Sequence, residues 1–471
     1  MALNPIKYSH FWNSIISFPP VKRMLLLSLK KCGKCGNQVI ESALNKYIGS
    51  DAGECEGCRL YSNVIIFWIE FLRRSLKIER RKVEKLLADN YVRRGIKSII
   101  NTFIHFGIKK PLTTYAPFLV VWDYTYRCNL KCRHCYSNAG KSSQEMTTEE
   151  ALNVVDQLAD FGVVALAFSG GEPLMRKDFF EVAKHAADCG LYVSLATNGT
   201  LIGKSTAKKL KDIGVHYVEI SLDGSCAKTH DTFRGFDGAF EMALRGLKNC
   251  IEQNLCTSIA TTLTKMNLRE IPEILELAEK IGVNRFTLFN FIPTGRGEEI
   301  VLQDVSPKER EEIMLFMLNK LLTGCKVTIL TTIPQLARVA VTYQNPEGEV
   351  FIPMAHMQTT KVSGRALALA DFIGGCGAGR LYCAIEPNGD VKPCVFIPIV
   401  VGNVKNEEFR DIWLNSDLFN ALRNRENLKG ACGKCEFKYI CGGCRARALA
   451  YNHDILAPDP GCIIVEQEFS K

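Results

Sequence analysis

Three cysteines, Cys128, Cys132 and Cys135, follow a short apolar run and are separated by three and by two residues. Three thiolates are one fewer than a 4Fe-4S cluster needs for complete ligation, so one iron of such a cluster keeps an open position. A small molecule can bind at an open position, which makes this spacing a candidate catalytic site. The alternatives are a zinc site and one part of a four-cysteine electron-transfer cluster.

A second motif, Gly170-Gly171-Glu172-Pro173, begins 35 residues after the third cysteine. Taken alone, it is equally well explained as a turn. Together with the cysteine spacing and Tyr136, directly after the third cysteine, it closely resembles the signature of radical S-adenosylmethionine (SAM) enzymes. The resemblance implies that the three cysteines hold a 4Fe-4S cluster. It also implies that SAM binds the open iron and is cleaved reductively to a 5′-deoxyadenosyl radical.

The same resemblance assigns further residues to SAM. Glu172 is expected to accept from the SAM ammonium group, while the two glycines let the backbone approach. The other expected SAM contacts are Tyr136, Thr197, Asn198, Ser221, Asp223, Pro293 and Gly295. Asn-Gly and Asp-Gly are also common turn sequences, so turn formation is the alternative at positions 198 and 223.

Short β-branched runs alternate with amphipathic helices between residues 118 and 290. The expected strands cover residues 118–123, 163–168, 192–196, 217–222, 258–263 and 285–289. Such alternation predicts an α/β fold with a parallel sheet. The resemblance narrows this to the partial (β/α)6 barrel of radical SAM proteins, with functional residues at the C-terminal ends of the strands.

Eight cysteines between residues 376 and 462 supply two more sets of four thiolates. Their spacing, with Gly389 four residues before Cys394, resembles the SPASM extension, which holds two auxiliary 4Fe-4S clusters. The resemblance implies Cys376, Cys383, Cys394 and Cys444 for the first cluster and Cys432, Cys435, Cys441 and Cys462 for the second. The chain departs from the family in having two residues, where three are usual, between Cys441 and Cys444. A zinc-binding tail is the alternative.

The first 110 residues are strongly basic, with 20 Lys and Arg against 8 Asp and Glu. They contain two CxxC pairs, Cys32 with Cys35 and Cys55 with Cys58. Two such pairs are typical of a tetrahedral four-sulfur site for zinc or a single iron. Because four protein ligands leave no open position, we expect a structural role. The alternative is four unligated cysteines.

Residues 63–106 combine aromatic and basic side chains at helical spacing, among them Trp68, Arg73 and Arg74. Such helices either pack on a neighbouring domain or lie on an anionic membrane surface. No run reaches the roughly 18 apolar residues of a membrane-spanning helix. Cysteines grouped for metals, with no signal-peptide pattern, predict a cytoplasmic protein, with peripheral membrane attachment as the alternative.

We therefore expect four regions. They are a metal site with basic helices (1–110), the barrel (111–300), a connecting or substrate-covering region (301–375) and the SPASM domain (376–471). In the third region, His356 is expected to be an ordinary loop residue, with the lining of a substrate cavity as the alternative.

These features predict an enzyme that abstracts hydrogen from an unactivated carbon. An isoprenoid lipid chain is slightly favoured as substrate, because the basic, aromatic first region has no other explanation. A tetrapyrrole is the alternative, because the sequence from Cys441 to Cys462 resembles the haem-biosynthesis decarboxylase branch. A peptide, as in SPASM maturases, is another.

The expected electron donor is a reductant such as ferredoxin or flavodoxin, and no nucleic-acid partner is expected. A non-catalytic iron-sulfur scaffold is the alternative from another class of protein. Glu172 and the three-cysteine loop argue against it, because a scaffold needs neither an open iron nor an ammonium acceptor.

Overall fold

The structure is a computed structural model that describes residues 18–50, 53–75, 78–141, 144–343, 349–352, 360–363, 372 and 374–469. The chain divides into two compact units at residues 118 and 119. His356 lies outside the described residues. Among the helices in the described ranges, none is long and apolar enough to cross a membrane.

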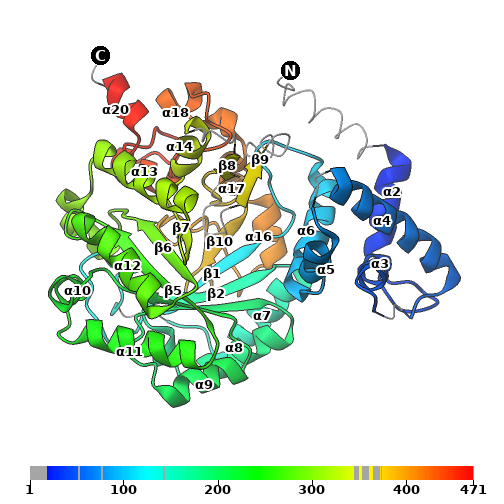
Figure 1. The fold of residues 1–471 in the computed structure, drawn as a ribbon, viewed down its shortest axis with the longest axis horizontal. Coiled ribbons are helices and arrows are strands. Elements are labelled where there is room, and N and C mark those ends of the chain that lie inside the picture. The colour runs from blue at the N-terminus through cyan, green and yellow to red at the C-terminus, as the bar shows by residue number, and fades with distance from the viewer. Residues whose placement is uncertain are drawn as a thin grey trace. The chain divides into compact units, whose positions relative to one another are not determined.

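The first unit is helical (Figure 1). Its described helices are α2 (Pro19–Leu29), α3 (Val39–Tyr47), α4 (Glu56–Ser75), α5 (Arg80–Leu87) and α6 (Asn90–Phe106). A small core forms where Ile40 and Leu44 of α3 pack with partly buried isoleucines of α4 and α6. Arg93 of α6 donates to Asn45 at 2.6 Å and to Glu41 at 3.2 Å, which joins α6 to α3.

The second unit is built on a ten-stranded sheet with the order β12-β11-β10-β1-β2-β3-β4-β5-β6-β7. The first six strands are β1 (Leu119–Thr125), β2 (Ala165–Gly170), β3 (Tyr192–Thr197), β4 (Tyr217–Ser221), β5 (Cys256–Leu263) and β6 (Arg285–Asn290). They are parallel and adjacent in chain order. The predicted radical SAM barrel is thereby confirmed.

Helices follow these strands along the outside of the curved sheet (Figure 1). They are α7 (Thr148–Phe161), α8 (Phe179–Asp188), α9 (Lys204–Asp212), α10 (Ala227–Arg234), α11 (Ala239–Glu252), α12 (Ile271–Ile281) and α13 (Pro307–Thr323). Local sequence explains their ends. For example, α7 begins with a capping box between Thr147 and Glu150 and ends at Gly162, whose φ is 100°.

The sheet is wider than the six predicted strands. On one side β7 (Thr328–Thr331) pairs with β6. On the other side β10 (Tyr382–Ile385) runs parallel to β1, with Cys383 opposite Val120. Antiparallel β11 (Asp390–Lys392) and β12 (Gly402–Asn403) then complete it. The C-terminal cysteine-rich region is thus continuous with the barrel sheet.

The other described elements are short. They are η1 (Pro173–Met175), η2 (Leu268–Glu270), η3 (Gly295–Gln303), α14 (Leu336–Thr342), β8 (Glu349–Ile352), β9 (Thr360–Ser363), α16 (Phe409–Asn415), α17 (Asp417–Arg423), η5 (Arg425–Asn427), α18 (Gly430–Lys434), α19 (Arg445–Asn452) and α20 (Ile463–Phe469). Strands β8 and β9 form a separate two-stranded sheet.

Candidate functional site

The three-cysteine loop follows the C-terminal end of β1. Burial raises the pKa of Cys128 to about 11, and the nearby thiols and Glu172 raise it further. Burial also raises the pKa of Cys132, although the Arg234 guanidinium, 3.6 Å from its sulfur, opposes this shift. Buried sulfurs that repel one another become thiolates readily only when cations bind them. The donor set therefore fits an iron-sulfur cluster.

Backbone geometry brings the Gly-Gly-Glu motif against this loop. Gly170 has φ +108°, and a Cβ there would lie 2.6 Å from the carbonyl oxygen of Thr125. The backbone N–H of Gly171 donates to the same oxygen at 2.7 Å, and that of Glu172 donates to Arg127. Only glycine permits this approach. The loop therefore places Glu172 beside Cys128.

Glu172 is completely buried, and burial raises the pKa of its carboxyl to about 7. Thr197, at the end of β3, donates its hydroxyl to both carboxylate oxygens, at 2.8 and 2.9 Å. The backbone N–H of Asn198 donates at 2.9 Å. The Asn198 side chain also donates to Asn129 in the cysteine loop, at 2.9 Å. The predicted SAM contacts from β2 and β3 therefore form one connected group with this loop.

Asp223 follows β4 and has a different environment from the one predicted for it. Its buried carboxylate lies 2.5 Å from a guanidinium nitrogen of Arg234 and accepts from the backbone N–H of Thr262 at 2.7 Å. Arg234, on α10, also reaches Cys132. Ser221 is half-buried at the end of β4. Sequence reasoning missed Arg234, because its partners lie 11 and 102 residues away and no local motif marks it.

The last predicted contacts pack on the back of the cysteine loop. Gly295 has φ +58°, and a Cβ there would lie 2.5 Å from the carbonyl oxygen of Tyr136. The neighbouring Pro293 is buried. The Tyr136 hydroxyl donates to Asp123 at 2.8 Å and lies 3.0 Å from the Ser169 hydroxyl. These contacts hold the loop over the ends of β1 and β2.

Two cavities accommodate most of the C-terminal cysteines. One, of about 380 Å³, is lined by all four cysteines predicted for the second auxiliary cluster, Cys432, Cys435, Cys441 and Cys462. The other, of about 310 Å³, is lined by Cys376, Cys394 and Cys444. Despite the shortened spacing before it, Cys444 lies with the first predicted set.

Cys383 does not lie with that set. Its neighbour Tyr382 lines the smaller cavity, and successive side chains of a strand point to opposite faces. Cys383 therefore lies on the other face of β10, completely buried in the barrel core. The charged group that acts on its pKa is Arg423, whereas the pKa values of Cys394 and Cys444 both respond to Cys376. The structure thus separates Cys383 from the ligand set predicted for it.

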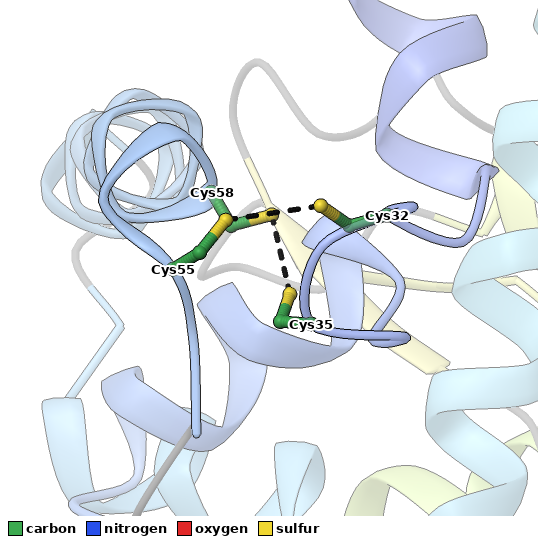
Figure 2. Close-up of side chains that lie close together, drawn as sticks. All are labelled: Cys32, Cys35, Cys55 and Cys58. Carbon is green, nitrogen blue, oxygen red and sulfur yellow. Dashed lines mark hydrogen bonds between the residues drawn. The ribbon is translucent and has the colours of Figure 1, made fainter.

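The four N-terminal cysteines meet in the first unit (Figure 2). Their sulfurs lie within 4.8 Å of one another, with 3.7 Å between Cys32 and Cys55 and 3.6 Å between Cys35 and Cys58. A tetrahedral zinc site with Zn–S bonds of about 2.3 Å requires sulfur separations of about 3.8 Å. Backbone N–H groups of Cys35 and Lys34 help to lower the pKa of Cys32 to about 6. The donor set fits a single zinc or iron ion.

Comparisons with known proteins agree with this geometry. Residues 122–278 match the family described as the Radical SAM superfamily, and residues 376–436 match SPASM, an iron-sulfur cluster-binding domain. A protein named AdoMet-dependent heme synthase from Methanosarcina barkeri is 39% identical over 353 residues, which are 74% of this chain and 97% of that protein. AdoMet is a synonym of SAM.

Two further proteins are similar. An Fe-coproporphyrin III synthase, also from Methanosarcina barkeri, is 35% identical over 370 residues, covering 74% of this chain and 88% of that protein. The crystal structure of SuiB from Streptococcus suis bound to S-adenosylmethionine has a TM-score of 0.61 at 18% identity. That match covers 90% of this chain and 93% of SuiB and concerns the fold.

Proposed function

Because the chain belongs to the radical SAM enzymes that carry a SPASM domain, we propose that it oxidatively decarboxylates a tetrapyrrole precursor of haem. The observation that carries this proposal is the match to a heme synthase over 97% of that protein's length. A second relative is named for another iron tetrapyrrole product.

In this proposal the loop cysteines hold the SAM-binding cluster, and Glu172 accepts from the SAM ammonium group. Thr197 and the Asn198 backbone already donate to Glu172, so they orient its carboxylate. The Arg234 side chain stays beside Cys132 because it is paired with Asp223. When bound, the cluster and SAM supply a 5′-deoxyadenosyl radical.

The reaction balances as a two-electron oxidation of each propionate side chain. One hydrogen atom leaves the carbon next to the ring and ends in 5′-deoxyadenosine. The resulting carbon radical loses carbon dioxide and one electron, and a vinyl group remains. The two C-terminal cavities place cysteine ligands for electron acceptors in the same unit as the barrel.

This proposal replaces the isoprenoid lipid chain that the sequence slightly favoured. That preference depended on the first 110 residues alone. The tetrapyrrole proposal depends on relatives that align with about three quarters of the chain. The residual feature of the first unit then needs a separate explanation.

The test uses anaerobically reconstituted full-length protein with dithionite, SAM and iron coproporphyrin III, which carries propionate groups. We expect 5′-deoxyadenosine and a porphyrin in which propionates have become vinyl groups, both detected by mass spectrometry. The matched control is Cys135→Ala, which should yield neither product. Formation of 5′-deoxyadenosine with every tested porphyrin unchanged contradicts the proposal.

We also propose that the first unit contacts an anionic membrane surface through α4. This helix packs Ile65, Ile66 and Ile69 into the core of the unit. Large apolar side chains on its opposite side are exposed, and we call them the outer face of α4: Leu60, Tyr61, Val64, Phe67, Trp68, Phe71 and Leu72. Their spacing of three and four residues places them on one side of the helix. A helix that is apolar on both sides requires a second apolar environment.

The charge of the unit favours an anionic surface as that environment. Residues 1–110 carry 20 basic against 8 acidic side chains. Arg74, Arg80 and Lys82 expose 74%, 59% and 71% of their side chains. Each such cation near an anionic membrane contributes on the order of 1 kcal/mol, which salt reduces. Apolar burial of the outer face of α4 adds a contribution that screening does not remove.

A further inference from the structure

Strand β10 carries two side chains that reach opposite sides of the sheet. Its register beside β1 pairs Tyr382 with Leu119 and Cys383 with Val120. Tyr382 lines the smaller C-terminal cavity, whereas Cys383 is completely buried in the barrel core. Moving Cys383 into the cavity requires a one-residue shift of β10, which would reverse every side chain of this strand. The strand therefore keeps Cys383 away from the other cysteines.

Tyr382 offers the cavity a polar group instead. Its hydroxyl donates to the sulfur of Cys394 at 3.1 Å. Its ring packs against Gly377, where a Cβ would lie 3.1 Å from the ring, so the loop before β10 closes directly over it. Burial and the nearby thiols of Cys394 and Cys376 raise the pKa of Tyr382 well above its usual value. The phenol therefore remains a hydrogen-bond donor.

We propose that the first auxiliary cluster is held by only three thiolates, those of Cys376, Cys394 and Cys444, with the Tyr382 hydroxyl bonded to the Cys394 sulfur. Cys383 is not a ligand. One iron of this cluster consequently has no cysteine ligand. Hydrogen bonds to ligand sulfurs raise the reduction potential of such clusters, because they stabilise the more negative, reduced form. Tyr382 thus tunes this cluster toward accepting an electron.

The inference rests on the SPASM assignment and is independent of the substrate. Its ligand test compares Cys383→Val with Cys394→Val, since both cysteines are buried and valine suits the sheet. Both variants are made in a full-length chain whose three loop cysteines are alanines, so that only the auxiliary clusters contribute 4Fe-4S signals. Iron and sulfide per chain are then measured after anaerobic reconstitution.

We expect Cys383→Val to keep the full iron content and Cys394→Val to lose about four irons, the content of one 4Fe-4S cluster. Thermal unfolding of both variants checks that they fold. If Cys383→Val loses the same iron as Cys394→Val, Cys383 is a ligand and the inference is wrong.

Tyr382→Phe removes only the hydroxyl and tests the hydrogen bond. We expect unchanged iron content and a more negative reduction potential for one auxiliary cluster, measured by a redox titration followed by electron paramagnetic resonance. An identical potential and spectrum would overturn the role of Tyr382. Because these readouts need no substrate, a failed decarboxylation assay leaves them valid, and their failure leaves that assay valid.

Discussion

The Thr197 hydroxyl lies 2.8 Å from one carboxylate oxygen of Glu172 and 2.9 Å from the other. The two residues follow neighbouring parallel strands and are 25 positions apart in the chain. Both are buried, and burial raises the pKa of Glu172 to about 7. A positively charged partner would favour the ionised form of this carboxylate. The pair is therefore an acceptor site prepared for a cation such as an ammonium group.

Glu172→Gln should keep every cluster but weaken SAM binding about 10- to 100-fold, since a hydrogen bond to a charged group contributes about 1.5–3 kcal/mol. Thr197→Val removes a donor that orients Glu172 and should weaken binding less. Equilibrium dialysis gives the affinity, and iron analysis checks the clusters. Unchanged SAM affinity in Glu172→Gln would show that Glu172 only shapes the turn.

The pair of Asp223 and Arg234 should stabilise the cysteine loop. Removing one partner of a buried ion pair costs about 3–5 kcal/mol, because the other charge stays buried. Asp223→Asn and Arg234→Met should each lower the melting temperature, and the double variant should be more stable than the sum of the two losses predicts. If Asp223→Asn keeps its stability and loses only SAM affinity, Asp223 is a direct SAM contact.

The sequence predicted features that depend on local patterns. The six barrel strands follow from alternating apolar runs, and the three-cysteine loop and the N-terminal CxxC pairs follow from spacing. The placement of Cys383 could not be predicted in this way, because it depends on pairing between β10 and β1, which are more than 250 residues apart. A one-residue difference in register decides which face a side chain occupies.

Arg234 shows a second limit of sequence patterns. It connects Asp223 to Cys132 across the end of the barrel, although the residues around it form an ordinary helix. The exposure of the outer face of α4 is a third case. Periodicity predicted an amphipathic helix, but only the packing of the unit shows that both of its sides are apolar.

The N-terminal metal site should support structure and not turnover. Cys55→Ser should release the zinc or iron ion and expose the first unit to protease, because the unit has only a small core. Reductive SAM cleavage by the barrel should persist. The control is Cys226→Ser, which changes an exposed cysteine outside the four-sulfur group. An intact first unit with abolished SAM cleavage would place this metal on the electron path.

Full-length protein should float with anionic liposomes, and high salt should weaken but not abolish the binding. Replacing Phe67 and Phe71 with serine should reduce binding at every salt concentration, because the loss is apolar. Replacing Arg74 and Arg80 with glutamate should reduce it mainly at low salt.

The matched control for the membrane experiment is Leu302→Ser in the second unit, where the native side chain is 82% exposed. It removes an exposed apolar group without changing the outer face of α4 and should bind as the native protein does. If native protein ignores anionic liposomes even at low salt, this surface does not contact membranes.

Hydrogen transfer tests the central claim most directly. Iron coproporphyrin III is labelled with deuterium on the propionate carbons next to the ring and incubated anaerobically with reduced protein and SAM. The account predicts 5′-deoxyadenosine that carries one deuterium, in amounts that match the vinyl groups formed. Deuterium-free 5′-deoxyadenosine together with unchanged porphyrin would contradict it.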